Sequence, residues 1–153
     1  MNQNWNRWVY ASCVDYFESN KGDYNLCIDN DRVDKNEYSL WADLAIIGAT
    51  ISKLTYTTCR LNVTIMLVLT DIPNDQDAYR LRQMTGYFST LMEMIPIYRY
   101  GLTAEPENDD TLLGCLQLDG PIEINNFGEP SPDTKLMQAT VRANFRMYLE
   151  GDN

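Results

Sequence analysis

The feature that most constrains the fold is an alternating run at residues 60–70. Apolar side chains occupy every second position of this run, and they are Leu61, Val63, Ile65, Leu67 and Leu69. Successive side chains of a β-strand point to opposite faces of its sheet, so this spacing predicts a strand with one buried face. We expect this strand to be central in its sheet.

Other segments predict further strands. Residues 40–46 alternate in the same way, and Gly48 is expected to close that strand. Residues 49–59 are polar but rich in β-branched side chains, which predicts an extended hairpin arm. Residues 97–100 form a short strand-like piece, and residues 112–118 and 122–127 are predicted to pair as a hairpin around Asp119 and Gly120. A proline-rich break at residues 128–133 precedes the final strand, whose predicted inward side chains are Met137, Ala139, Val141, Ala143, Phe145 and Met147.

Two amphipathic helices accompany these strands. The first is predicted after Asn4, ends near Gly22, and carries an apolar stripe made of Trp5, Trp8, Val9, Ser12, Cys13, Tyr16 and Phe17. The second begins near Asn74 and Asp77 and is expected to stop before Pro96, which lacks a backbone donor. Its apolar stripe consists of Leu81, Met84, Phe88, Leu91 and Ile95. An acidic stretch at residues 105–110 is expected to be a mobile, solvated loop.

These elements predict a single α+β domain that spans residues 1–153. A length of 153 residues and a hydrophobic share of 44% suit one core. We expect a mostly antiparallel β-sheet or sandwich flanked by two helices, with the helices covering one face of the sheet.

The sequence contains no histidine, which removes the commonest general base and the commonest metal ligand. It also lacks the glycine-rich phosphate loop of nucleotide-binding proteins. The four cysteines are too widely spaced for a zinc knuckle or a redox pair, and we expect them to be reduced and partly buried; they are Cys13, Cys27, Cys59 and Cys115. We therefore expect no enzyme, and no catalytic, cofactor-binding or metal-binding residue. An enzyme built on a pair of carboxylates is the remaining catalytic alternative.

The net charge of −10 and the pI near 4.3 disfavour attraction to DNA, RNA or an anionic membrane. Such a charge gives solubility, and it also suits a surface that stays close to nucleic acid without binding it. No apolar run approaches the ~20 residues of a membrane-spanning helix, and the first residues lack the apolar core of a signal peptide. We therefore expect synthesis in the cytoplasm and no membrane partner.

Three stretches carry a family resemblance. They are residues 38–47, the strand and helix of residues 60–91 with a helix start near residues 74–79, and a set that runs from residues 113–116 through 125–128 to 138–145. In pattern, spacing and order of elements, the chain resembles the tail terminator proteins of long-tailed bacteriophages from about residue 26 to residue 149. None of the stretches is a catalytic signature.

The resemblance implies a structural protein of the virion tail and neck, made in the host cytoplasm. Tail terminators form hexameric rings that cap the finished tail tube, stop its polymerisation and dock to head-side neck proteins. The implied partners are further copies of the chain, the tail tube protein and a neck or head–tail connector protein. DNA would pass through the ring without specific binding, because an acidic lumen repels its phosphates. Closing a ring requires two different patches on each copy, one meeting the other on the next copy.

Exposed aromatic and arginine side chains are expected to make the contacts between copies. The candidate interface residues are Trp41, Tyr56, Tyr98, Tyr100, Arg142 and Arg146. For each aromatic residue the alternative is packing within one copy, and for the two arginines it is pairing with a carboxylate of the same copy.

Two further functions stay open on the sequence alone. Another neck, tail-tube or baseplate subunit would share the α+β sandwich plan, and its stoichiometry and position in the particle would distinguish it. An acidic inhibitor that mimics DNA would fit the net charge, and it would compete with DNA for a DNA-binding protein.

Overall fold

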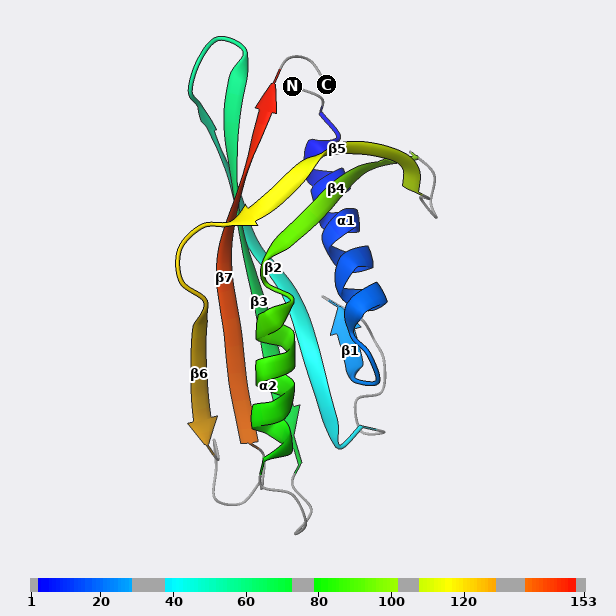
Figure 1. The fold of residues 1–153 in the computed structure, drawn as a ribbon, viewed down its shortest axis with the longest axis vertical. Helices are drawn as coiled ribbons and strands as arrows, with labels where there is room; N and C mark the ends of the chain where they lie inside the picture. The colour runs from blue at the N-terminus through cyan, green and yellow to red at the C-terminus, as the bar shows by residue number, and fades with distance from the viewer. Residues whose placement is uncertain (1–2, 29–37, 73–78, 102–107, 129–136, 151–153) are drawn as a thin grey trace.

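The computed structural model of the chain describes residues 3–28, 38–72, 79–101, 108–128 and 137–150. Along the chain the elements are α1 (Trp5–Asn20), β1 (Asn25–Ile28), β2 (Leu40–Lys53), β3 (Thr58–Asp71), α2 (Arg80–Thr90), β4 (Met94–Tyr100), β5 (Asn108–Leu118), β6 (Glu123–Gly128) and β7 (Met137–Glu150). Figure 1 shows an elongated molecule in which β2, β3 and β7 run along most of the length. The predicted α+β class with two helices is confirmed.

The described strands form one seven-stranded sheet in the order β1–β2–β3–β7–β5–β4, with β6 pairing β7 as well. Among the described pairings only β1 with β2 is parallel. The central position predicted for residues 60–70 is confirmed, because β3 pairs β2 on one side and β7 on the other. At its middle, Leu67 lies opposite Leu44 and Val141.

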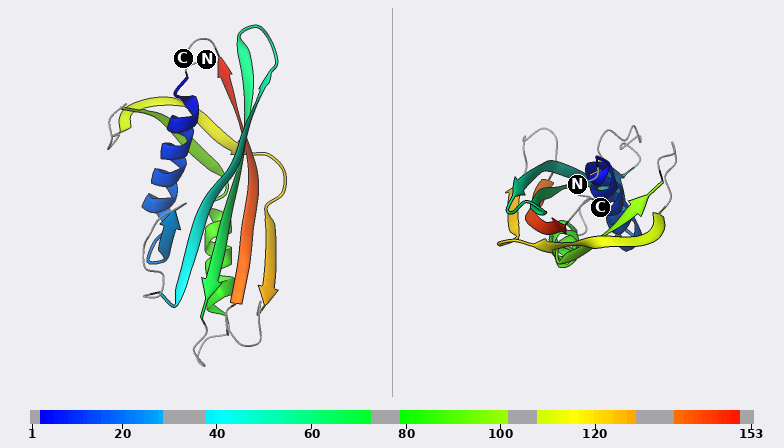
Figure 2. Two further views of the ribbon diagram at one scale, coloured as in Figure 1. Left: turned by 180° about the vertical axis from the view of Figure 1, so that it is seen from behind. Right: turned by 90° about the horizontal axis from the view of Figure 1, so that it is seen from above.

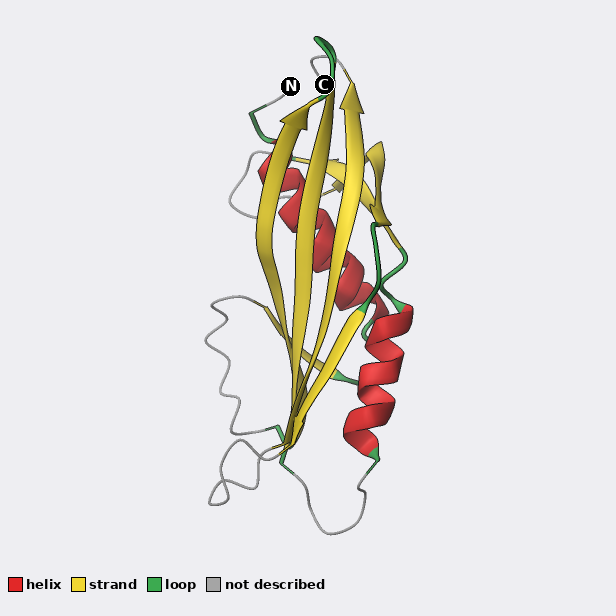
Figure 3. Ribbon diagram, turned by 90° about the vertical axis from the view of Figure 1, so that its left-hand side faces the viewer, coloured by secondary structure: helices red, strands yellow, loops and turns green. Residues whose placement is uncertain are grey.

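The core lies between the long strands and the helices, which cover one face of the sheet (Figure 3). All five alternate apolar side chains of β3 are buried, as predicted. The inward residues predicted for the final strand are also buried from Ala139 to Met147, and Met137 is half-buried. The apolar stripe of α1 is confirmed too, since its members from Trp8 to Phe17 pack into the same core or against its edge. Gly22, with φ of +63°, ends the helix where the sequence predicts.

The two helices and the sheet are joined by contacts at the end of α1. The Tyr16 hydroxyl donates a hydrogen bond of 2.8 Å to the carbonyl of Leu91, just after α2. The rings of Tyr24 and Phe88 lie 5.8 Å apart, with Tyr87 beside both. These contacts place α1 and α2 end to end along the sheet rather than side by side (Figure 1).

The prediction that Gly48 closes the second strand is wrong. The strand continues to Lys53, and the pairing of β2 with β3 shifts by one residue between Ile46 and Gly48. Such a β-bulge moves the inward-facing positions from even to odd numbers, so that Ala49 lies opposite the buried Val63. The predicted hairpin arm at residues 49–59 is confirmed.

The prediction that the second helix extends to Ile95 is wrong. Helix α2 ends at Thr90, and Ile95 and Ile97 are alternate buried residues of β4. Ile95 lies four residues after Leu91, which suits one face of a helix, and two residues before Ile97, which suits one face of a strand. The apolar pattern alone therefore does not separate a helix from a strand there. Pro96 does not stop the element either, because β4 is the outer strand of the sheet at this end and tolerates a missing donor.

The hairpin predicted for residues 112–118 and 122–127 is also wrong. Strands β5 and β6 each pair with β7 rather than with one another, β5 near Arg146 and β6 near Arg142. Part of the predicted acidic loop is strand as well, because β5 begins at Asn108 and Asp109 pairs with Arg99 of β4. The predicted helix start at Asn74 and Asp77 and the break at residues 129–133 lie outside the described residues.

All four cysteines are free thiols, as expected. Cys13 and Cys27 are buried, and Cys59 and Cys115 are partly buried. In the part of the chain that the structure describes, neither helix is long and apolar enough to cross a membrane.

Arg80 fastens the start of α2 to the sheet. Its guanidinium donates to the carboxylate of Asp71, which is only 2% exposed, and to the carbonyls of Ser39 and Ile72 at 3.1 and 2.9 Å.

We predict that Arg80→Ala lowers the free energy of unfolding by about 3 kcal/mol, because it leaves the Asp71 carboxylate buried without its cation. Urea unfolding measures this loss. The control is Arg82→Ala on an exposed site of the same helix, with an expected change within about 0.5 kcal/mol; equal losses in both variants would contradict the prediction.

Burial raises the pKa of the Cys13 thiol to about 12, from 9.0. A group whose pKa is raised by folding contributes its stability fully below the unfolded pKa and loses it as the pH rises. We therefore predict that the free energy of unfolding falls between pH 9 and 12, by up to about 1.4 kcal/mol per pH unit from this thiol. Cys13→Ala should show a shallower fall in urea unfolding across that window. Parallel curves for the two proteins would refute the assignment.

Candidate assembly surfaces

The β2–β3 hairpin projects beyond both helices as an arm, which we define as residues 47–64 (Figure 1). Its two strands stay in register from Ala49 opposite Val63 to Lys53 opposite Cys59. The end of β7 adds a third strand, with Leu149 opposite Cys59. Because a third strand supports the hairpin almost to its turn, the arm is a stiff projection rather than a loose loop.

The tip of the arm presents apolar side chains to solvent. The Thr55 side-chain oxygen accepts hydrogen bonds from the backbone N–H groups of Thr57 and Thr58 at 3.3 and 3.0 Å, which holds the turn together. Tyr56 is fully exposed, and Leu54 is 53% exposed. A defined turn therefore carries two apolar side chains away from the core.

The charge of the arm differs from that of the rest of the chain. No Asp or Glu occurs between Asp43 and Asp71, although the chain holds 22 acidic residues. The two charged residues in that interval are Lys53 and Arg60. Arg60 pairs with Asp119 at 2.6 Å, whereas Lys53 lies exposed near the tip. The tip is thus a basic and apolar element on an acidic protein.

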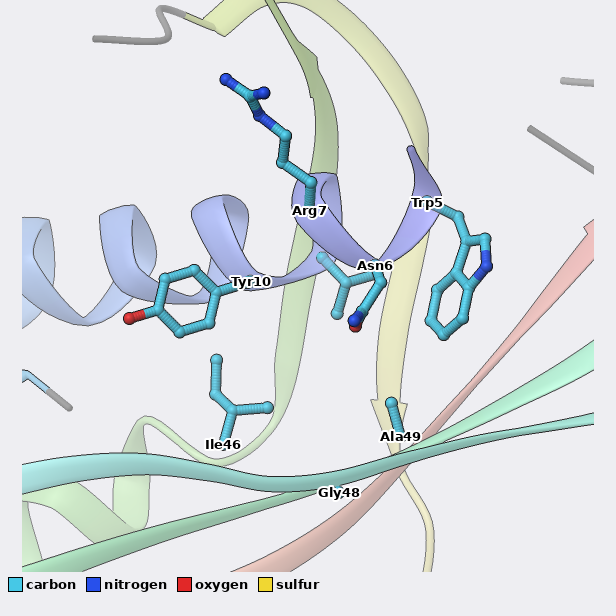
Figure 4. Close-up of a pocket in the computed structure, with 8 residues that line it drawn as sticks. Trp5, Asn6, Arg7, Tyr10, Ile46, Gly48 and Ala49 are labelled. Atoms are coloured by element: carbon cyan, nitrogen blue, oxygen red, sulfur yellow. The ribbon is translucent and has the colours of Figure 1, made fainter. Parts of the chain in front are cut away.

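A groove of about 570 Å³ lies at the base of the arm, between the first turns of α1 and β2 (Figure 4). Its lining residues are Trp5, Asn6, Arg7, Val9, Tyr10, Ile46, Gly48 and Ala49. The groove exists because α1 packs chiefly on β4, which swings away from the long strands and carries the helix with it (Figure 2). The groove is also open at Gly48, which has no side chain. A Cβ atom on Gly48 would have no neighbouring atom within 4 Å.

A second hollow of about 470 Å³ continues along the outer side of α1 and shares Arg7 and Tyr10 with the groove. It is lined farther along by Asp15, Glu18 and Tyr100. Burial, followed by the negative charge of Asp15, raises the pKa of the Tyr100 hydroxyl. The side of the groove that is nearer the end of α1 therefore presents the carboxylates of Asp15 and Glu18, the latter 3.8 Å from the Lys21 ammonium.

Side chains of α1 cover the outer edge of β4. Ser12 accepts a hydrogen bond from the backbone N–H of Tyr98 at 2.9 Å, and its hydroxyl lies 3.4 Å from the carbonyl oxygen of the same residue. The Trp8 indole N–H donates to the carbonyl of Tyr100 at 2.9 Å. Backbone groups that another strand would otherwise recognise are thus satisfied within the molecule.

The structure does not bring the six predicted interface residues into one patch. Tyr56 stands alone at the arm tip. Tyr98 is half-buried and its backbone bonds Ser12 of α1, and Tyr100 is 7% exposed, so its ring offers little surface to another copy. An interface role for these residues stays a prediction.

The other three predicted residues share the sheet face opposite the helices. The Trp41 indole N–H donates to Asp43 at 3.1 Å, and Arg146 lies 3.7 Å from Asp119 of the same copy. Arg142 is exposed between Met66 and Glu123 on neighbouring strands. For Arg146 the pairing within one copy is therefore the one observed.

The sequence patterns do not predict the groove. Trp5 and Val9 belong to the predicted apolar stripe of α1 and Ala49 to the predicted arm, and nothing in these patterns indicates that the two segments meet. The absence of acidic residues between Asp43 and Asp71 was the available signal for a distinct surface.

The described residues contain no group of three or more Cys, Asp or Glu side chains that could hold a metal ion. No protein-family model matches the sequence, and no curated protein is detectably similar to it.

Ser12→Ala should destabilise the fold, because Ser12 is buried and its loss leaves the N–H of Tyr98 without this acceptor. We predict a loss of about 1–3 kcal/mol in the free energy of unfolding. The control is Ser89→Ala on α2, whose hydroxyl bonds only a local carbonyl, with a predicted loss below about 0.5 kcal/mol. Chemical unfolding of both variants checks this, and a neutral Ser12→Ala would show that the β4 edge does not need the helix.

Proposed function

We propose that the chain is a structural protein of a phage virion, a tail terminator whose copies form a ring that caps the tail tube and joins it to the neck. The specific family rests on the sequence resemblance at residues 38–47, 60–91, 113–116, 125–128 and 138–145. An α+β sheet flanked by helices occurs in many protein families, so the fold supports this assignment only in outline.

The observation that carries the proposal is the presence of two different surfaces on one chain, the apolar arm tip and the groove beside α1. A ring needs a heterologous interface, in which one patch of each copy meets a different patch of the next. A protein that acts through contact area also fits a sequence without histidine or a nucleotide-binding loop.

Charge supports the same role. Each copy contributes a net charge of −10, so a ring of copies concentrates negative charge around its channel. DNA phosphates would be repelled from such a wall and would slide rather than bind. The remaining proposed partners, the tail tube protein and a neck or connector protein, would contact the two open faces of the ring.

Measuring the mass of the purified protein tests this function directly. We expect sedimentation velocity and native mass spectrometry to show a species of six times the 17.7 kDa monomer, either alone or after addition of cognate tail tubes. Electron microscopy should then show single rings at tube ends. A protein that stays monomeric both alone and with tubes would overturn the proposal, and stacked tubes built from this chain would reassign it as a tube subunit.

A further inference from the structure

The arm and the groove of one copy cannot meet each other. The groove is lined by Gly48 and Ala49 at the base of the arm, and Leu54 lies five residues farther along the same stiff strands. At about 3.4 Å per residue, the tip stands roughly 17 Å from the base. The exposed tip therefore cannot bind the groove of its own copy.

We propose that the arm tip of one copy docks into the groove beside α1 of a second copy. This inference rests on the proposed assembly of identical copies and names the surfaces that make it. The occupant is a second copy of this chain because the chain itself carries a projecting element whose chemistry matches the groove.

The apolar part of the match is between Tyr56 with Leu54 and the wall made by Trp5, Tyr10 and Ile46. A groove of about 570 Å³ falls within the size range of pockets that hold small ligands, so it has room for two side chains. Tyrosine is a frequent anchor of interfaces because it buries a large ring while its hydroxyl stays hydrated.

The charged part of the match is between Lys53 and Asp15 of α1. Asp15 lines the hollow that continues from the groove, and Lys53 is the exposed cation of an arm without acidic residues. Glu18 lines the same hollow, but its carboxylate already lies 3.8 Å from the Lys21 ammonium. Arg7 also lines both hollows, but its guanidinium donates to the carbonyl of Gly101 at 3.3 Å. Opposite charges orient the tip along α1 and steer the encounter of two copies that otherwise repel each other.

The contact is heterologous, since the arm and the groove are different surfaces. If each copy offers its arm to the next in the same rotational sense, the copies form a ring where the rotation closes and an open filament where it does not. A reciprocal exchange between two copies would instead give a closed dimer.

The first test removes the apolar side chains of the tip, with Leu112 as a control because its exposure of 55% is close to the 53% of Leu54. Leu54→Ser alone should weaken self-association, and Leu54→Ser combined with Tyr56→Ser should weaken it at least about tenfold, as expected for removal of an interface anchor. Leu112→Ser on β5 should leave association unchanged. Circular dichroism and thermal unfolding confirm that all three proteins stay folded.

The second test exchanges charges between the two surfaces. Lys53→Glu and Asp15→Lys should each weaken association at low salt, because each places like charges together. The protein with both changes should recover association to within about threefold of the original, since the pair is restored with its signs reversed. A simple loss of charge or of folding would not be rescued in this way.

The outcomes separate this inference from the proposed function. If the unchanged chain assembles and the Leu54 and Tyr56 variant assembles equally well, the docking is overturned while the ring survives. The same holds if the double charge exchange fails to recover association. A dimer that depends on Leu54 and Tyr56 would support the docking and overturn the ring, and a chain that never self-associates would overturn both.

Discussion

The double pairing of β3 is the constraint on which the other elements depend. This strand bonds β2 along one edge and β7 along the other, while its inner face carries five buried apolar side chains. A shift by one residue would turn that face toward solvent, so the burial fixes the register of both neighbours. The helices then have a single apolar surface to cover, and the hairpin continues past them as the arm.

The same strand connects the core to the proposed assembly surfaces. At one end β3 is tied to α2 through Asp71 and Arg80, and at the other it becomes the second strand of the arm. The arm tip is therefore held by the packing of the whole sheet, which lowers the entropy that a docking event must remove. Lys53 and Tyr56 are positioned by residues far from them in space.

Local patterns predicted which elements exist, and failed where a choice depended on distant residues. Period two at residues 60–70 and 137–147 identified two of the three long strands and their buried faces. It could not show that β5 pairs β7 instead of β6, because alternation carries no information about the partner strand. Of the four aromatic candidates, Tyr56 is fully exposed and Tyr100 is buried, because exposure of an aromatic side chain depends on packing partners that are distant in sequence. The groove escaped prediction because it forms only when α1 is held on β4, some ninety residues away in sequence, as the bond from Trp8 to Tyr100 shows.

The position of β7 has a consequence for how the chain folds as it is made. Strand β7 lies in the middle of the sheet, with β3 along one edge and both β5 and β6 along the other. During synthesis, the ribosome releases β7 after β3, β5 and β6. Until then, the edge of β3 that pairs with β7 has no partner strand. Such late, long-range pairing slows folding and leaves an edge open to association with other nascent chains. Pairing of β7 with β3 is then what completes the buried face of the sheet.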